Sequence, residues 1–188
     1  DDLSFLDLEY LEGIRYRGNS LTSLSALPKP LREKYALSLI RDIAAGLKYT
    51  HSQGIRHYHL QTGDILLTPQ MRAKISGYAR GKNELGFSVQ ESETRKADAA
   101  YIAPEQKDEA RFGNPGMKTD IYQLGVILYE LLTGLFPYSP EAAVRAGDHS
   151  WQGTGENRLI LPSELRGNLA RFDPILFRML SRDKDRKS

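Results

Sequence analysis

Two stretches of the chain carry hydrophobic residues at the spacing of an α-helix. Residues 31–52 place apolar side chains three and four positions apart, which predicts a helix with one buried face. The expected face consists of Tyr35, Leu39, Ile40, Ile43 and Leu47. Gly54 follows and is typical of the residue just beyond a helix C-terminus.

The second stretch, residues 119–132 (TDIYQLGVILYELL), is apolar on all sides instead of along one stripe. A helix of this kind is buried at the centre of a domain. Thr119 or Asp120 can cap its N-terminus, and Gly134 can cap its C-terminus. A further helix is expected to begin at residues 173–174 (DP), with the Asp as N-cap and the Pro in the first turn.

Shorter apolar runs predict strands. The expected strands cover residues 3–11, 55–57, 65–68 and 72–75, with a turn at 68–71. The remaining segments are polar: residues 13–25, with a short helix near 21–27, and two long loops at 77–97 and 147–162. These elements predict a mainly α (α+β) domain, in which a few short strands accompany one central buried helix.

Composition narrows the class of protein. The 188 residues suffice for one domain with its own core. Lys plus Arg number 26 and Asp plus Glu 24, and the net charge of +2 argues against nucleic acid or an anionic membrane as partner. The chain has no cysteine, which excludes disulfides and thiolate metal sites. No apolar run reaches the roughly 18 residues of a membrane span, and we expect a cytoplasmic location.

Several motifs follow one another along the chain. They are residues 9–11 (EYL), 49–57 (YTHSQGIRH), 57–67 (HYHLQTGDILL), 103–105 (APE), 120–134 (DIYQLGVILYELLTG) and 179–186 (MLSRDKDR). In this order they resemble the C-terminal lobe of a eukaryotic-like (Hanks-type) Ser/Thr protein kinase. The resemblance implies that residues 1–13 form the last N-lobe strand and the hinge, and residues 77–105 an activation-segment-like loop.

The N-terminal lobe has no counterpart in this sequence. The chain contains neither the Gly-rich loop nor the V-A-I-K strand of a kinase. It also opens with Asp1 instead of Met. We therefore expect a kinase-like C-lobe over residues 1–188, taken from a longer protein.

The catalytic positions of the family hold other residues here. The resemblance places His59 where kinases carry the catalytic Asp, and Gln61 where they carry a Lys near the γ-phosphate. Asp64 stands at the metal-binding Asn, and Gly77 at the metal-binding Asp of the D-F-G triplet. An imidazole can accept a proton but supplies no fixed negative charge. Asp64 can still ligate a metal through oxygen.

Other matching positions imply structural or binding roles. By resemblance, His57 packs beneath the catalytic loop and Asp120 holds the backbone of that loop by hydrogen bonds. Glu105 and Arg186 are expected to form a buried ion pair, which is costly to break from one side. The implied nucleotide-binding positions are Glu9, Leu11 and Leu66.

These substitutions predict a pseudokinase domain with a regulatory or protein-interaction role and without ordinary phosphotransfer. The alternative is an atypical nucleotide-binding phosphotransferase that uses His59 as base and Asp64 as metal ligand. A protein partner is expected in the first case. ATP and Mg²⁺ remain candidate ligands of the complete protein, and the oligomeric state stays open.

Overall fold

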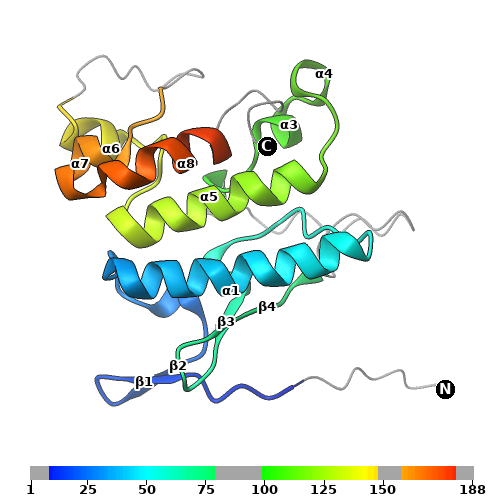
Figure 1. Cartoon of the computed structure of the whole chain (residues 1–188), viewed down its shortest axis with the longest axis vertical. Helices are drawn as coiled ribbons and strands as arrows, with labels where there is room; N and C mark the ends of the chain where they lie inside the picture. The colour runs from blue at the N-terminus through cyan, green and yellow to red at the C-terminus, as the bar shows by residue number, and fades with distance from the viewer. Residues whose placement is uncertain (1–8, 79–98, 148–157, 181–188) are drawn as a thin grey trace.

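The fold is arranged around α5 (Met117–Thr133), the apolar helix of the sequence pattern. In the computed structural model, which describes residues 9–78, 99–147 and 158–180, this helix lies between α1 (Glu33–Ser52) and α8 (Asp173–Met179) (Figure 1). Its residues Val126, Ile127 and Leu131 are completely buried. The prediction of a central buried helix is confirmed, because only a helix packed on both sides needs apolar residues all round.

The ends of α5 agree only partly with expectation. Gly134 adopts the left-handed conformation at φ 76° and donates its N–H to the carbonyl of Glu130, as predicted for a C-cap. The N-cap is Gly116, so the helix begins before the predicted residues. Thr119 lies inside the first turn, where its Oγ1 accepts the Gly116 N–H at 2.9 Å. Asp120 does not cap the helix, because its carboxylate is directed to another segment.

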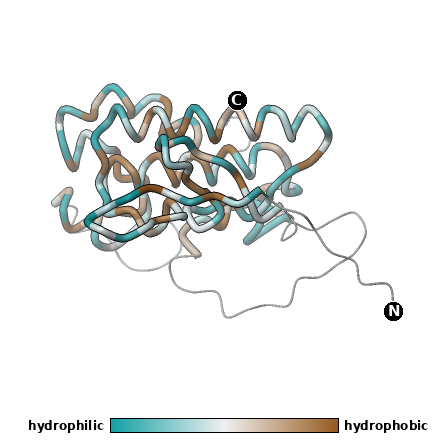
Figure 2. Tube along the Cα trace, turned by 90° about the horizontal axis from the view of Figure 1, so that it is seen from below, coloured by the Kyte–Doolittle hydropathy of each residue, from teal (hydrophilic) through white to brown (hydrophobic). Residues whose placement is uncertain are grey.

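The helix α1 has the predicted extent but a slightly different buried face. Its buried residues are Ala36, Leu39, Ile43 and Leu47. Tyr35 was expected among them, yet 41% of its surface is exposed. The helix turns Ala36 inward instead, because the small residue continues the row of Leu39 and Ile43 at helical spacing. The colours of hydrophobic and hydrophilic residues alternate along the tube in Figure 2, as expected for helices with one buried face.

Two small antiparallel hairpins lie on the side of α1 that faces away from α5 (Figure 1). The first joins β1 (Ile14–Tyr16) to β2 (Asn19–Leu21), and the second joins β3 (Ile65–Leu67) to β4 (Ala73–Ile75). The second was predicted, with its turn. The first was not, because its strands are short and polar, and Arg17 and Gly18 form its turn at positive φ.

Two other strand predictions fail or fall partly outside the described residues. Residues 55–57 form no strand, since the backbone of His57 bonds to a side chain of α5 instead of to a neighbouring strand. Of the strand predicted at 3–11, residues 1–8 lie outside the described part, and residues 9–11 have no regular structure. The short helix expected near residues 21–27 is the 3-10 turn η1 (Leu24–Ala26).

Short helices complete the domain. They are η2 (Thr62–Asp64), α3 (Pro104–Lys107), α4 (Glu109–Phe112), α6 (Pro140–Arg145), α7 (Pro162–Leu165) and η4 (Gly167–Phe172). Asp173 is the first residue of α8 and not its N-cap, which is Phe172. The carboxylate of Asp173 accepts the N–H of Ser163 at 3.1 Å and so connects α8 to α7.

The fold is mainly helical with a few short strands, as predicted. Within residues 9–78, 99–147 and 158–180, no helix has both the length and the apolar character needed to cross a membrane.

Candidate functional site

The loop of residues 57–64 is held from below by a buried carboxylate. Asp120 is fully buried in the first turn of α5. Its Oδ2 accepts the N–H of His57 at 2.9 Å, and its Oδ1 accepts the N–H of Tyr58 at 2.7 Å. The Nε2 atom of His51, at the end of α1, lies 2.7 Å from the same Oδ2. One side chain thus joins α1, α5 and the loop.

Two glutamines hold the next residues of the loop. Gln123, one turn after Asp120 on α5, is 1% exposed. Its Oε1 accepts the N–H of Leu60 at 2.8 Å, and its Nε2 donates to the carbonyl of Tyr58 at 2.7 Å. Gln106 of α3 donates to the same carbonyl at 2.7 Å. These bonds accompany Tyr58 at a φ of 63°, a conformation that non-glycine residues seldom adopt.

Sequence reasoning did not select either glutamine. The available signal was Gln123 itself, a polar residue in the middle of an otherwise apolar helix. A buried amide must find hydrogen-bond partners, so its presence there indicates a polar contact with another segment.

His57 lies in the core beneath the loop. Its side chain is fully buried, and its Nε2 lies 2.7 Å from the carbonyl of Ser76. Because a carbonyl only accepts, this nitrogen carries the proton. The ring packs against Tyr78 with 4.8 Å between centroids. Burial raises the pKa of Tyr78, whose hydroxyl also contacts Thr50. Because its side chain is fully buried, His57 packs in the core and is not exposed to a substrate.

His59 and Gln61 occupy the face of the loop. His59 is exposed, while its neighbours Tyr58 and Leu60 are held by the bonds described above. Gln61 is half-buried and precedes η2 as its N-cap residue. The structure therefore presents an imidazole to solvent at the position expected for the catalytic carboxylate.

Asp64 and Gly77 come together although thirteen positions separate them. The carbonyl of Asp64 accepts two hydrogen bonds from Ser76, one from its N–H at 2.8 Å and one from its Oγ at 2.9 Å. These bonds bring the Asp64 carboxyl against Gly77, which has a φ of +85°. A Cβ at residue 77 would lie 2.7 Å from Asp64 Oδ1.

This pair does not fit the metal site of a phosphotransferase. Asp64 is 2% exposed, and Gly77 offers no side chain. Among the described residues, no group of three or more His, Cys, Asp and Glu side chains could hold a metal ion. Paired metals in kinases are held by the D-F-G Asp together with the loop Asn, whereas here only position 64 carries a side chain that can bind a metal.

Glu105 is buried at the start of α3. It is 1% exposed and accepts the hydroxyl of Thr119 at 2.9 Å. Its expected partner, Arg186, lies outside the described residues. The buried ion pair therefore stays a prediction.

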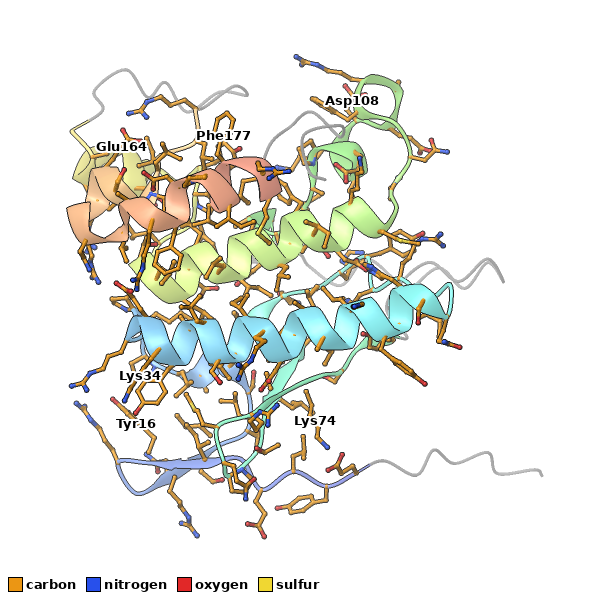
Figure 3. All side chains as sticks on the ribbon, viewed as in Figure 1. Tyr16, Lys34, Lys74, Asp108, Glu164 and Phe177 are labelled. Atoms are coloured by element: carbon orange, nitrogen blue, oxygen red, sulfur yellow. The ribbon has the colours of Figure 1, made fainter. Side chains whose placement is uncertain are left out.

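Two of the three expected nucleotide positions lie beside Lys74 of β4, since Leu66 is its cross-strand partner and Glu9 is its ion-pair partner. Leu66 on β3 and Leu11 are half-buried, whereas Glu9 is exposed and forms an ion pair with Lys74 on β4. Lys74 points toward the N-terminal segment in Figure 3. An open groove of about 780 Å³ lies next to the N-terminal residues 10–12, but neither Leu11 nor Leu66 lines it. Its lining residues are Tyr10, Glu12, Gly13, Ile14, Arg15, Ser20, Tyr35, Pro69 and Met71.

A buried polar cluster, also missed by sequence reasoning, joins the loop to two other segments. The hydroxyl of Tyr101, just before α3, donates to Glu130 of α5 and lies 3.1 Å from the hydroxyl of Thr62. Lys29, in the segment before α1, lies 3.0 Å from the other oxygen of Glu130. Burial, reinforced by the Glu130 carboxylate, raises the pKa of Tyr101 far above its usual range, so its hydroxyl stays protonated.

Comparison with known proteins gives consistent relatives. The chain is 26% identical over 187 residues to the serine/threonine-protein kinase PknB of Mycobacterium tuberculosis, covering 98% of this chain and 28% of PknB. It is 29% identical over 144 residues to the serine/threonine-protein kinase PrkC of Bacillus subtilis, covering 77% of this chain and 21% of PrkC. It is 32% identical over 115 residues to a probable serine/threonine-protein kinase PknB of Lactococcus lactis, covering 61% of this chain and 18% of that protein. The chain thus spans less than a third of these relatives.

Residues 5–168 match the family described as "Protein kinase domain". The matched part includes α5, the loop of residues 57–64 and the Ala103-Pro104-Glu105 motif. Together with the Ser/Thr kinase relatives, this match shows that the chain belongs to the protein kinase family.

Proposed function

We propose that the chain is the C-terminal lobe of a pseudokinase, with a regulatory or protein-binding role in place of phosphotransfer. The observation that carries this proposal is the combination of a firmly held loop with altered reactive positions. Asp120 and Gln123 bind the loop backbone, while position 77 has no side chain and position 59 is an exposed histidine.

Magnitudes support the absence of useful catalysis. A positioned general base contributes roughly 10²–10⁴ to a rate. Protein kinases turn over at about 1–100 s⁻¹. A kinase that lost its catalytic Asp, its D-F-G Asp and the Lys near the γ-phosphate together would fall far below that rate.

The partner in this proposal is another protein. Its contact is expected on the helical surface, where Val144 of α6 and Phe177 of α8 expose apolar side chains. Figure 3 shows Phe177 on the side of α8 that faces away from α5. A cytoplasmic location, and a separate N-terminal lobe elsewhere in a longer protein, are part of the same proposal.

The test is a phosphotransfer assay on the complete protein, with radiolabelled ATP, Mg²⁺ or Mn²⁺, and generic protein substrates. We expect no transfer above that of a heat-inactivated sample. Transfer that is abolished in His59→Ala would overturn the proposal and support the phosphotransferase alternative. The matched control is His149→Ala, which changes a histidine outside the motifs that resemble those of kinases.

A second measurement separates the two functions at the level of binding. ATP is titrated with and without Mg²⁺ while thermal stability is followed. Metal-dependent ATP binding that is lost in Asp64→Ala would favour the phosphotransferase. Binding that depends on neither the metal nor Asp64 agrees with the pseudokinase.

A further inference from the structure

The contact between Asp64 and Gly77 is closer than any residue with a side chain would permit at position 77. A Cβ there would lie 2.7 Å from Asp64 Oδ1 and 3.1 Å from Asp64 Cγ. Real Cβ atoms essentially never approach a neighbour within 3.0 Å. The colliding atoms belong to a side chain that is 2% exposed, and its backbone carbonyl is held by two bonds from Ser76. The Asp64 side chain therefore has little room to move away from a Cβ at position 77.

We infer that Asp64 and Gly77 are a sterically coupled pair, in which the Asp64 carboxyl occupies the space that a side chain at position 77 would need. A single substitution that restores a carboxylate at position 77 would therefore displace Asp64. Any nucleotide that binds at these two residues does so without a divalent cation held between them. The second statement rests on the proposed pseudokinase function, whereas the steric coupling does not.

The backbone conformation at Gly77 adds a separate cost that must be subtracted. An L-residue is disfavoured in the left-handed region because its Cβ lies too close to the following carbonyl oxygen. Gly18 has the same φ of +85°, and no atom lies within 4 Å of the position its Cβ would take. Gly18→Ala is therefore a matched control, since it carries the backbone cost without the collision.

The test is a set of melting temperatures on the full chain. Gly18→Ala is expected to lower Tm by about 2–4 °C, the shift typical of a mild destabilisation in a domain of this size. Gly77→Ala is expected to lower Tm by at least twice as much. In an Asp64→Ala background the Gly77→Ala penalty should fall to that of Gly18→Ala, whereas in an Asp64→Asn background, which keeps the shape, it should persist.

Either of two results would overturn the coupling. The first is a Gly77→Ala penalty no larger than that of Gly18→Ala. The second is an unchanged Gly77→Ala penalty after Asp64→Ala, which would assign the cost to other neighbours. If Gly77→Ala does not fold at all, the double variant Gly77→Ala with Asp64→Ala must fold for the inference to stand.

The cation statement has its own measurement. Tm of the complete protein with ATP is compared in millimolar Mg²⁺ and in chelator, for the wild type and Asp64→Ala. We expect no Mg²⁺-dependent difference that Asp64→Ala removes. A difference that disappears in Asp64→Ala would overturn this statement and leave the steric result intact. Phosphotransfer is read out separately, so failure of the proposed function is distinguishable from both.

Discussion

The loop of residues 57–64 has two sides with different contacts. Its underside is bound by side chains of α5 and α3, and its outer face carries His59 and Gln61. The underside is densely bonded: Asp120 and Gln123 take up the N–H groups of His57, Tyr58 and Leu60. The outer face presents an exposed imidazole at position 59 and a half-buried amide at position 61. The difference teaches that the conformation of a loop and its reactivity depend on separate residues, because the backbone bonds come from α5 and α3 while reactivity comes from side chains on the loop.

The largest expected effect is on the underside. Asp120→Ala leaves the buried N–H of His57 and the part-buried N–H of Tyr58 without their acceptor, and a buried unpaired group costs about 1–3 kcal/mol. We expect the free energy of unfolding, measured with urea, to fall by about 3 kcal/mol or more. Asp108→Ala, which removes an exposed N-cap of α4, should cost only about 1 kcal/mol. Equal losses in the two variants would mean that the Asp120 bonds do not support the fold.

A smaller effect is expected from the neighbouring amide. Gln123→Ala removes the acceptor of the Leu60 N–H, while the carbonyl of Tyr58 keeps its bond from Gln106. We expect a loss of about 1–3 kcal/mol, together with faster hydrogen exchange at the Leu60 amide. Gln70→Ala, on the exposed turn before β4, should stay within about 0.5 kcal/mol. Unchanged exchange at Leu60 would speak against a role for Gln123 in holding the loop.

A third effect depends on pH and lies away from the loop. Asp42 of α1 accepts two hydrogen bonds from Arg72, each at 2.7 Å, and one from the N–H of Ala73. The Arg72 bonds are the main reason why the pKa of Asp42 is lowered from its usual value of 3.8. The stabilisation from this pair is therefore fully present above about pH 4 and is lost as the pH falls through the lowered pKa of Asp42.

Arg72→Ala tests this dependence. Because Arg72 is 62% exposed, we expect only a small loss of stability at neutral pH. The loss should shrink as the pH falls through the lowered pKa of Asp42, because a protonated carboxyl no longer pairs with Arg72. Urea unfolding at neutral and acidic pH measures this loss, and Arg56→Ala is the control, because the Arg56 guanidinium donates to the backbone carbonyl of Gly54. A loss that stays constant with pH would contradict the assignment.

The smallest effect is expected on the outer face. His59→Ala should change the free energy of unfolding by less than about 0.5 kcal/mol, because the side chain is exposed. It should also leave phosphotransfer at background. A large destabilisation would show that the imidazole supports the loop, and the contrast between its two sides would then be weaker.

The sequence by itself determined the elements whose causes are local. The apolar residues all round α5 and the glycine at its C-terminus are properties of one short segment, and the structure has both. The same holds for the extent of α1 and for the β3–β4 hairpin, which follow from helical spacing and from a turn between two apolar runs. The sequence motifs also identified the kinase family, which the family match confirms.

Only the tertiary structure decided the contacts between distant segments. Residues 55–57 look like a strand, but the N–H of His57 binds Asp120, sixty-three positions further on, and the N–H of Ile55 binds the carbonyl of Thr50. The polar β1–β2 hairpin and the Tyr101–Glu130–Lys29 cluster had no local pattern to indicate them, and the amide of Gln123 indicated a polar contact but not its partners. The collision that forbids a side chain at Gly77 likewise depends on where the fold places Asp64. A residue type states what a group can bind, whereas the packed chain alone determines which groups come within 3 Å of one another.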